Sequence, residues 1–149
     1  VVVGVDFLSL PEARSLMKWK PIKALSPGAT DLPRDLFFDD FKPVDWSPMT
    51  FIFRRSQIAT PRSLKDLLQK QYANSLAIQD PTSSASGLYF LIWVVSVYGE
   101  EEGLKYFKEL KSSIRLVAPS WSSAYSLFQN NQVPMVFSFF TSTIYHYVN

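Results

Sequence analysis

The stretch Leu76-Ala-Ile-Gln-Asp-Pro-Thr-Ser-Ser-Ala-Ser-Gly87 contains a short apolar run, a proline and a serine-rich turn, in that order. This order predicts a strand over 76–79 followed by the start of a helix, whose first amides have no partner inside the helix. Two later stretches repeat the pattern, Pro119-Ser-Trp-Ser-Ser-Ala-Tyr125 and Ser138-Phe-Phe-Thr-Ser-Thr-Ile-Tyr145. If the strands lie side by side and parallel, the three turns meet in one crevice, where open α/β sheets bind ligands.

Helical and extended patterns alternate from residue 63 onward. We expect helices over 63–72, 87–98, 100–111 and 122–129, and strands over 44–53, 76–79, 114–117 and 134–139. In the helix over 100–111 we expect Leu104, Phe107 and Leu110 to form the buried face. Alternation of this kind predicts an α/β layer with a mainly parallel sheet.

The first third of the chain is less regular. Val1 to Val5 is a β-branched run typical of a strand buried on both faces, and a helix is expected over 10–19. The proline-rich stretch 21–43 reads as a long irregular connection. Because the chain begins inside an apparent strand, we expect it to be a piece of a longer or processed protein.

Composition narrows the function classes. The 149 residues are 47% hydrophobic and 19% charged, which is typical of a folded domain and excludes disorder. The net charge is +2 without a basic stripe, so a nucleic-acid partner is not expected. The chain has no cysteine and a single histidine, His146. His146 has no acidic or thiol neighbour at ligand spacing, so no metal site is expected.

Each turn has a functional and a structural interpretation. Ser83 and Ser84 beside free helix amides can receive an anion, or can simply cap the helix. Trp121 can form a flat wall for a planar or cationic ring, or can belong to the core. Phe139 and Tyr145 can line the same site or close the end of the core.

Two carboxylates follow apolar runs elsewhere in the chain. Asp6 and Asp45 can face the crevice and meet a cation, or can cap the next helix. No pair of carboxylates has a spacing that indicates acid and base catalysis.

The same residues carry a resemblance to a known family. Gln79-Asp-Pro-Thr-Ser-Ser-Ala-Ser-Gly-Leu, Ser120-Trp-Ser-Ser-Ala-Tyr-Ser-Leu-Phe and Phe137-Ser-Phe-Phe-Thr-Ser-Thr-Ile-Tyr-His resemble segments of the periplasmic thiamine-binding proteins of bacterial ABC importers. Val2-Val-Gly-Val-Asp6, Pro43-Val-Asp45 and Arg62-Ser-Leu-Lys-Asp-Leu67 match in the same order. The resemblance covers nearly the whole chain and is weakest between Lys20 and Asp40.

The resemblance implies an α/β protein with the type II periplasmic-binding-protein fold, of which the chain holds mostly one lobe. Residues 1–40 would belong to the first lobe and a connection, and residues 41–149 to a hinge-crossing strand and the second lobe. It also implies ligand contacts, with Ser84 on the phosphate side and Trp121, Phe139 and Tyr145 lining the pocket. Family members carry tyrosine at the position of Phe139, and a basic residue and a proline in the first turn, so a hydroxyl contact and some phosphate affinity are expected to be lost.

The function implied is periplasmic capture of thiamine or thiamine phosphates for delivery to a membrane permease. Thiamine would be cargo, with no cofactor and no catalysis. Two alternatives stay open: another solute, such as ferric iron or a polyamine, and a thiamine-processing enzyme of similar fold. Such an enzyme would need a nucleophile, usually a cysteine. Self-association is also expected, because one lobe alone exposes apolar surface.

Overall fold

The computed structural model describes residues 2–22 and 34–144. The chain forms two compact units, residues 1–47 and 48–149. The first unit contains η1 (Phe7–Ser9), α1 (Leu10–Leu16) and η2 (Arg34–Leu36). The helix expected over 10–19 is therefore present but ends three residues early.

An ion pair holds the parts of the first unit together. Arg14 donates two hydrogen bonds to the carboxylate of Asp40, at 2.8 and 2.7 Å, and its guanidinium lies 4.7 Å from the centre of the Phe38 ring. The hydrogen bond from Arg14 lowers the pKa of the Asp40 carboxyl.

The strand expected over 1–5 is wrong for the residues that the structure describes. Residues 2–5 have no strand assignment, and the side chains of Val2 and Val3 are exposed. Gly4 has a φ of +88°, which interrupts an extended backbone. Among the described residues of the first unit this run has no neighbouring strand, because the four-stranded sheet is built from later residues.

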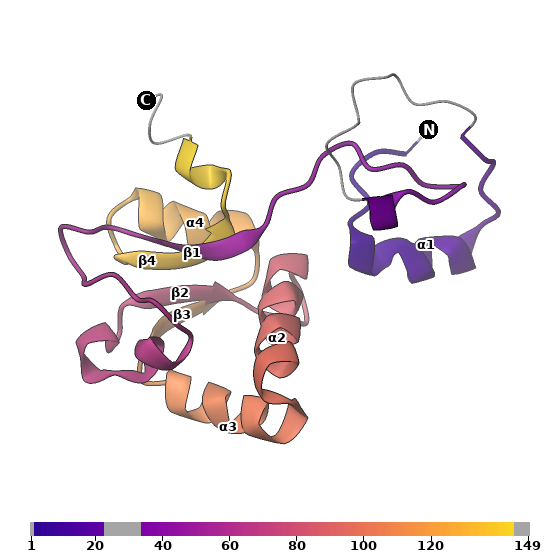
Figure 1. Ribbon diagram of the computed structural model, residues 1–149. Helices are drawn as coiled ribbons and strands as arrows, with labels where there is room; N and C mark the ends of the chain where they lie inside the picture. The colour runs from indigo at the N-terminus through magenta and orange to yellow at the C-terminus, as the bar shows by residue number, and fades with distance from the viewer. Residues whose placement is uncertain (1, 23–33, 145–149) are drawn as a thin grey trace. The chain divides into compact units, whose positions relative to one another are not determined.

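That mixed sheet organises the second unit (Figure 1). Its strands are β1 (Met49–Phe53), β2 (Leu76–Gln79), β3 (Ile114–Ala118) and β4 (Met135–Phe139), in the order β1-β4-β2-β3. β2 is parallel to both β3 and β4, and β1 is antiparallel to β4. The predicted strands are confirmed within one residue at most ends; the exception is 44–53, where pairing begins only after Pro48.

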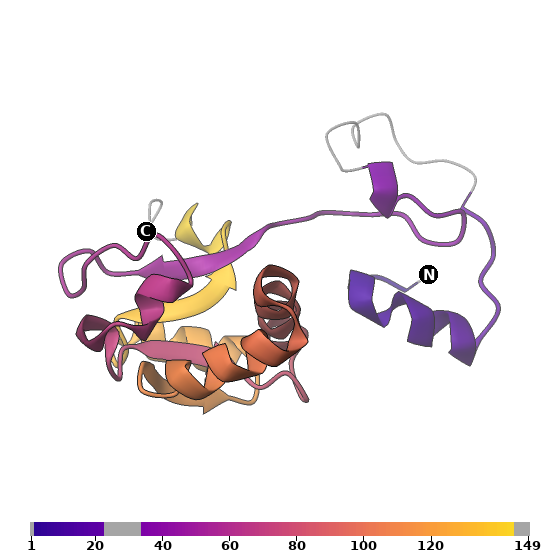
Figure 2. The same ribbon diagram turned by 60° about the horizontal axis from the view of Figure 1, so that its bottom comes forward.

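Helices cover both faces of the sheet (Figures 1 and 2). α2 (Ala85–Tyr98) and α3 (Glu100–Leu110) pack with the cluster around Ile78 and Phe137, and α4 (Trp121–Gln129) packs with the cluster around Ala77 and Val136. Alternate residues of β2 and β4 thus point to opposite helical layers. This is the α/β architecture that the sequence predicts.

Two local predictions hold only in part. The segment 63–72 has the expected cap, an amide of Asp66 donating to Ser63 Oγ at 3.2 Å, but forms two short 3-10 helices, η3 (Lys65–Leu68) and η4 (Lys70–Tyr72). The extended backbone of Gln69 separates them. In α3 Leu110 is buried as predicted and Phe107 packs partly buried against the core, but Leu104 is 52% exposed, and Gly103 and Tyr106 are buried in addition.

α2 is less buried than its composition predicts. The helix contains no charged residue, and its mid-helix Phe90 and Val94 are buried. Ile92, Trp93 and Val97 are nevertheless exposed. The apolar surface of α2 therefore exceeds what the sheet and α3 cover.

Candidate ligand-binding site

The three serine-rich turns do meet at one edge of the sheet. β2, β3 and β4 run parallel, so Gln79, Ala118 and Phe139, their last residues, lie at the same end. Two side-chain hydrogen bonds join the turns to one another. Ser83 Oγ donates to the carbonyl oxygen of Pro119 at 2.8 Å, and Trp121 Nε1 donates to Ser138 Oγ at 2.9 Å. The turns at the carboxyl ends of the parallel strands are therefore connected to one another by side-chain hydrogen bonds.

The first turn is held by Asp80. Its Oδ1 accepts the amide of Thr82 at 2.8 Å and the hydroxyl of Thr82 at 2.7 Å. Both bonds lower the pKa of the Asp80 carboxyl, and the bond from the Thr82 hydroxyl has the larger effect. The carboxylate thus fixes the turn that leads into α2.

Ser84 occupies the N-cap position of α2 but makes no side-chain capping bond. Its hydroxyl instead shares a hydrogen bond of 2.8 Å with the hydroxyl of Ser86. The capping interpretation of Ser84 is therefore wrong for its side chain. The first amides of a helix left uncapped in this way, with the positive end of the helix dipole, favour an anionic group.

Gly87 allows α2 to start close to the end of β2. A Cβ atom at this position would lie 2.5 Å from the carbonyl oxygen of Gln79 and 2.6 Å from the carbonyl carbon of Asp80. Such contacts are too short for any side chain, so the glycine is required by the close approach of the two backbones. It sets the position of the serine turn against the sheet.

The second turn caps its helix conventionally. Ser120 Oγ accepts the amide of Ser123 at 3.2 Å, and hydroxyls of Ser122 and Ser123 lie within hydrogen-bonding distance of it. Here the structural interpretation of a serine is confirmed. The starts of α2 and α4 therefore differ, because the N-cap side chain accepts a hydrogen bond from a helix amide in α4 but not in α2.

An aromatic wall follows that cap. Trp121 is half-buried and stacks on Tyr125, with ring centroids 5.0 Å apart and planes 15° apart. Phe139 approaches from the end of β4, with its centroid 5.9 Å from that of Trp121 and a tilt of 56°. Aromatic neighbours in these geometries attract one another and hold a rigid apolar face. Trp121, Tyr125 and Phe139 together form this aromatic wall.

The structure brings together only part of the predicted site. Ser83, Ser84, Trp121 and Phe139 lie in the second unit, at the carboxyl ends of the parallel strands or in the turns that follow them. Asp6 belongs to the first unit, where its Oδ1 accepts the amides of Leu8 and Ser9, at 3.0 and 3.3 Å, and so caps η1. Asp45 is exposed in the same unit, and Tyr145 lies outside the residues that the structure describes.

Three polar contributions were missed by sequence reasoning. Ser138 and Ser142 back the aromatic wall, and the Tyr125 hydroxyl donates to the carbonyl oxygen of Ser142 at 3.1 Å. The signal was available for Ser138, because a serine in the apolar strand Met135–Phe139 needs a hydrogen-bonding partner when buried.

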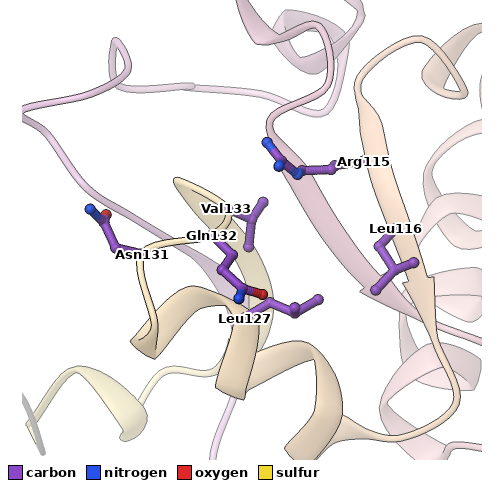
Figure 3. A pocket seen from close by; sticks show the side chains of 6 residues that line it. All are labelled: Arg115, Leu116, Leu127, Asn131, Gln132 and Val133. Carbon is purple, nitrogen blue, oxygen red and sulfur yellow. The ribbon is translucent and has the colours of Figure 1, made fainter.

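A shallow pocket of about 490 Å³ lies at the other end of these strands (Figure 3). It is lined by Arg115, Leu116, Leu127, Asn131, Gln132 and Val133. These residues belong to the first part of β3, to α4 and to the segment before β4, so the pocket shares no residue with the predicted site.

Within the described ranges, 2–22 and 34–144, no helix has the length and apolar character needed to cross a membrane. The same ranges hold no group of three or more acidic, histidine or cysteine side chains that could bind a metal ion.

The fold and the sequence together define a class. Residues 17–146 match the bacterial extracellular solute-binding protein family, so the chain belongs to that family. The fold is that of the type II periplasmic binding proteins, as in the structure of the periplasmic binding protein AfuA from Actinobacillus pleuropneumoniae, which has a TM-score of 0.58 at 18% identity and covers 62% of this chain and 31% of that one.

Particular relatives lie closer in sequence. The "Thiamine-binding periplasmic protein" of Brucella abortus biovar 1 (strain 9-941) is 34% identical over 99% of this chain and 44% of its own length. The protein of the same name from Escherichia coli (strain K12) is 31% identical over 98% of this chain and 44% of its own. A solved structure named "Periplasmic thiamin binding protein" matches with a TM-score of 0.77 and 29% identity, covering 93% of this chain and 43% of that chain. The chain thus spans under half the length of these relatives.

Proposed function

We propose that the chain supplies one ligand-binding lobe of a periplasmic protein that captures thiamine or thiamine phosphates for an ABC importer. The observation that carries the proposal is the aromatic wall at the sheet edge, beside the uncapped start of α2. A flat cationic ring such as thiazolium is attracted to the face of tryptophan, and a phosphate suits helix amides. The names of the relatives support the same ligand.

The roles of the individual residues follow from their positions. Trp121 and Phe139 would contact the rings, and Ser84, with Ser83 in the same turn, would lie on the phosphate side. Tyr145 would extend the wall beyond the turn after β4. Asp6 would come from the first lobe, which holds residues 1–40. Asp45 would come from the hinge-crossing strand, at the start of the range 41–149 that also holds the second lobe.

The remaining proposals concern the biological setting. The ligand would be cargo that is bound and released unchanged, so the protein would be neither an enzyme nor dependent on a cofactor. It would act in the periplasm and deliver its ligand to a membrane permease. The exposed apolar face of α2 favours self-association of the isolated chain, which sedimentation velocity would measure.

The test is calorimetric titration of the full-length gene product with thiamine, thiamine monophosphate and thiamine diphosphate. Spermidine and ferric citrate represent the other solute classes that the sequence leaves open. We expect saturable binding of thiamine or a phosphate at micromolar concentration or below, and none of the controls. Saturable binding of spermidine or iron without thiamine binding would overturn the proposal.

A further inference from the structure

A fully buried serine lies behind the aromatic wall. Ser138 has no exposed surface, and its strand neighbours Val136 and Phe137 are equally buried and apolar. A hydroxyl in such surroundings is costly unless it is hydrogen-bonded. Its partners are Nε1 of Trp121 at 2.9 Å and the hydroxyl of Ser142 at 3.1 Å.

The bond to Ser138 fixes what Trp121 can offer to a ligand. The stacked ring of Tyr125 covers one face of the indole, and the hydrogen bond occupies its only donor. The stacking on one face and the hydrogen bond at the Nε1 edge both restrain rotation of the Trp121 side chain. A ligand can therefore contact only the uncovered carbon atoms of the indole, because its nitrogen is already hydrogen-bonded.

The turn after β4 holds both rings of this stack. Ser142 shares a hydrogen bond with Ser138, and its carbonyl oxygen accepts the hydroxyl of Tyr125 at 3.1 Å. The turn therefore reaches Trp121 through Ser138 and reaches Tyr125 directly. A displacement of this turn would alter the orientation of the whole wall.

We propose that Ser138 is a positioning residue of the ligand site, which orients the Trp121 ring and couples it to the turn at Ser142. The expected effect of Ser138 on thiamine affinity rests on the proposed function. The orientation of the Trp121 ring can be measured in the protein without ligand, and so independently of that function.

A matched control is available in the same unit. Ser113 is as fully buried as Ser138, and its hydroxyl donates to the carbonyl oxygen of Leu67, remote from the wall. Ser113→Ala and Ser138→Ala each remove one buried hydroxyl. Both lower stability, but only Ser138→Ala leaves the Trp121 indole without its acceptor.

The experiment follows the indole protons in ¹H–¹⁵N spectra of the full-length protein, with Trp121 assigned by Trp121→Phe. In Ser138→Ala we expect the Nε1–H of Trp121 to exchange with solvent at least tenfold faster, whereas Ser113→Ala leaves it unchanged. Ser142→Ala removes only the hydrogen bond between the hydroxyls of Ser142 and Ser138, so we expect a smaller increase in the exchange rate of the Trp121 Nε1–H. The Nε1–H of Trp19, bonded to the carbonyl oxygen of Ala13 in the first unit, is the internal reference.

The second measurement is affinity for thiamine by calorimetry. A lost hydrogen bond of ordinary strength predicts about threefold to tenfold weaker binding in Ser138→Ala and no change in Ser113→Ala. Unchanged exchange of the Trp121 proton in both Ser138→Ala and Ser142→Ala would overturn the positioning role. Faster exchange in a protein whose parent binds no thiamine would support the positioning role and contradict the proposed function.

Discussion

Ser83 Oγ donates a hydrogen bond to the carbonyl oxygen of Pro119 at 2.8 Å, which ties the turn after β2 to the turn after β3. The two residues are 36 positions apart in the chain. The bond holds the start of α2 beside the start of α4, which is the arrangement that a ligand reaching from the aromatic wall to the α2 amides requires.

Removing this bond should loosen the first turn. In Ser83→Ala we expect the amides of the turn at Ser83 and Ser84 to exchange with solvent severalfold faster, because an exposed hydrogen bond contributes only a modest free energy. Ser122→Ala is the control, since its exposed hydroxyl lies in the second turn, 3.1 Å from the hydroxyl of Ser120. Hydrogen exchange by mass spectrometry makes the comparison. Equal exchange in the parent protein and in Ser83→Ala would show that the bond does not hold the turns.

Gly87 and Gly103 offer a paired test of the packing of α2. Gly87→Ala should destabilise the protein by about 2 kcal/mol or more, because its Cβ would lie 2.5 Å from the Gln79 carbonyl oxygen. Gly103→Ala places its Cβ 3.5 Å from Val95, an ordinary contact, and gains helix propensity of up to about 1 kcal/mol. Urea denaturation measures both. A Gly87→Ala protein as stable as the parent would contradict the close approach of α2 to β2.

Ser84 should contribute more to phosphate forms of the ligand than to thiamine. Ser84→Ala removes a hydroxyl at the start of α2, whose amides favour an anion. We expect a fall of about threefold to tenfold in affinity for thiamine monophosphate, and a smaller fall for thiamine. Calorimetry with both ligands gives the ratio, and Ser122→Ala serves as the control. An equal loss for both ligands would argue against a phosphate at this position.

Tyr106 links α3 to the segment before η3 and makes stability depend on alkaline pH. Its hydroxyl donates to the carbonyl oxygen of Leu64 at 2.8 Å, and burial raises its pKa above the ordinary value of 10. The folded protein holds this proton more tightly than the unfolded chain does. The contribution of Tyr106 to the free energy of unfolding is therefore fully present below about pH 10, and it is lost as the pH rises further.

Tyr106→Phe tests that dependence. The variant should be less stable by about 1 kcal/mol at neutral pH, because the Leu64 carbonyl loses its donor. It should also lose less stability than the parent as the pH rises above 10. Urea denaturation at pH 8 and at pH 10.5 gives the two slopes, and parallel losses in the parent and the variant would contradict the assignment to Tyr106.

The sequence predicts those parts of the fold that depend on local pattern. The run Leu76–Gln79 is bounded by a proline turn, and its strand appears with the expected limits. The run 1–5 has an equally strong β pattern, but its described residues, 2–5, have no strand partner among the described residues and form no strand. Pairing is decided by the rest of the chain and not by the run itself.

The errors within helices have a different cause. Leu104 is more hydrophobic than Gly103 and Tyr106, but in α3 it is these two residues that are buried in the core. Gly103 faces Val95 of α2, and the Tyr106 hydroxyl donates to the carbonyl oxygen of Leu64. Neither partner is visible in the spacing of α3 itself.

The candidate site was predictable at the level of its turns. Parallel strands bring their ends together, so Ser83, Ser84, Trp121 and Phe139 follow from topology. The network of Ser138, Ser142 and Tyr125 does not, because it depends on the orientation of individual side chains across two strands and a helix.

Thiamine binding at the sheet edge beside Trp121 is tested most directly by a thiamine titration of the full-length protein, followed by chemical shifts in ¹H–¹⁵N spectra. We expect saturable shifts at the Trp121 indole and at amides 83–87, 120–121 and 138–142. Shifts confined to the pocket lined by Arg115, Leu116 and Val133, with the Trp121 indole unmoved, would contradict it.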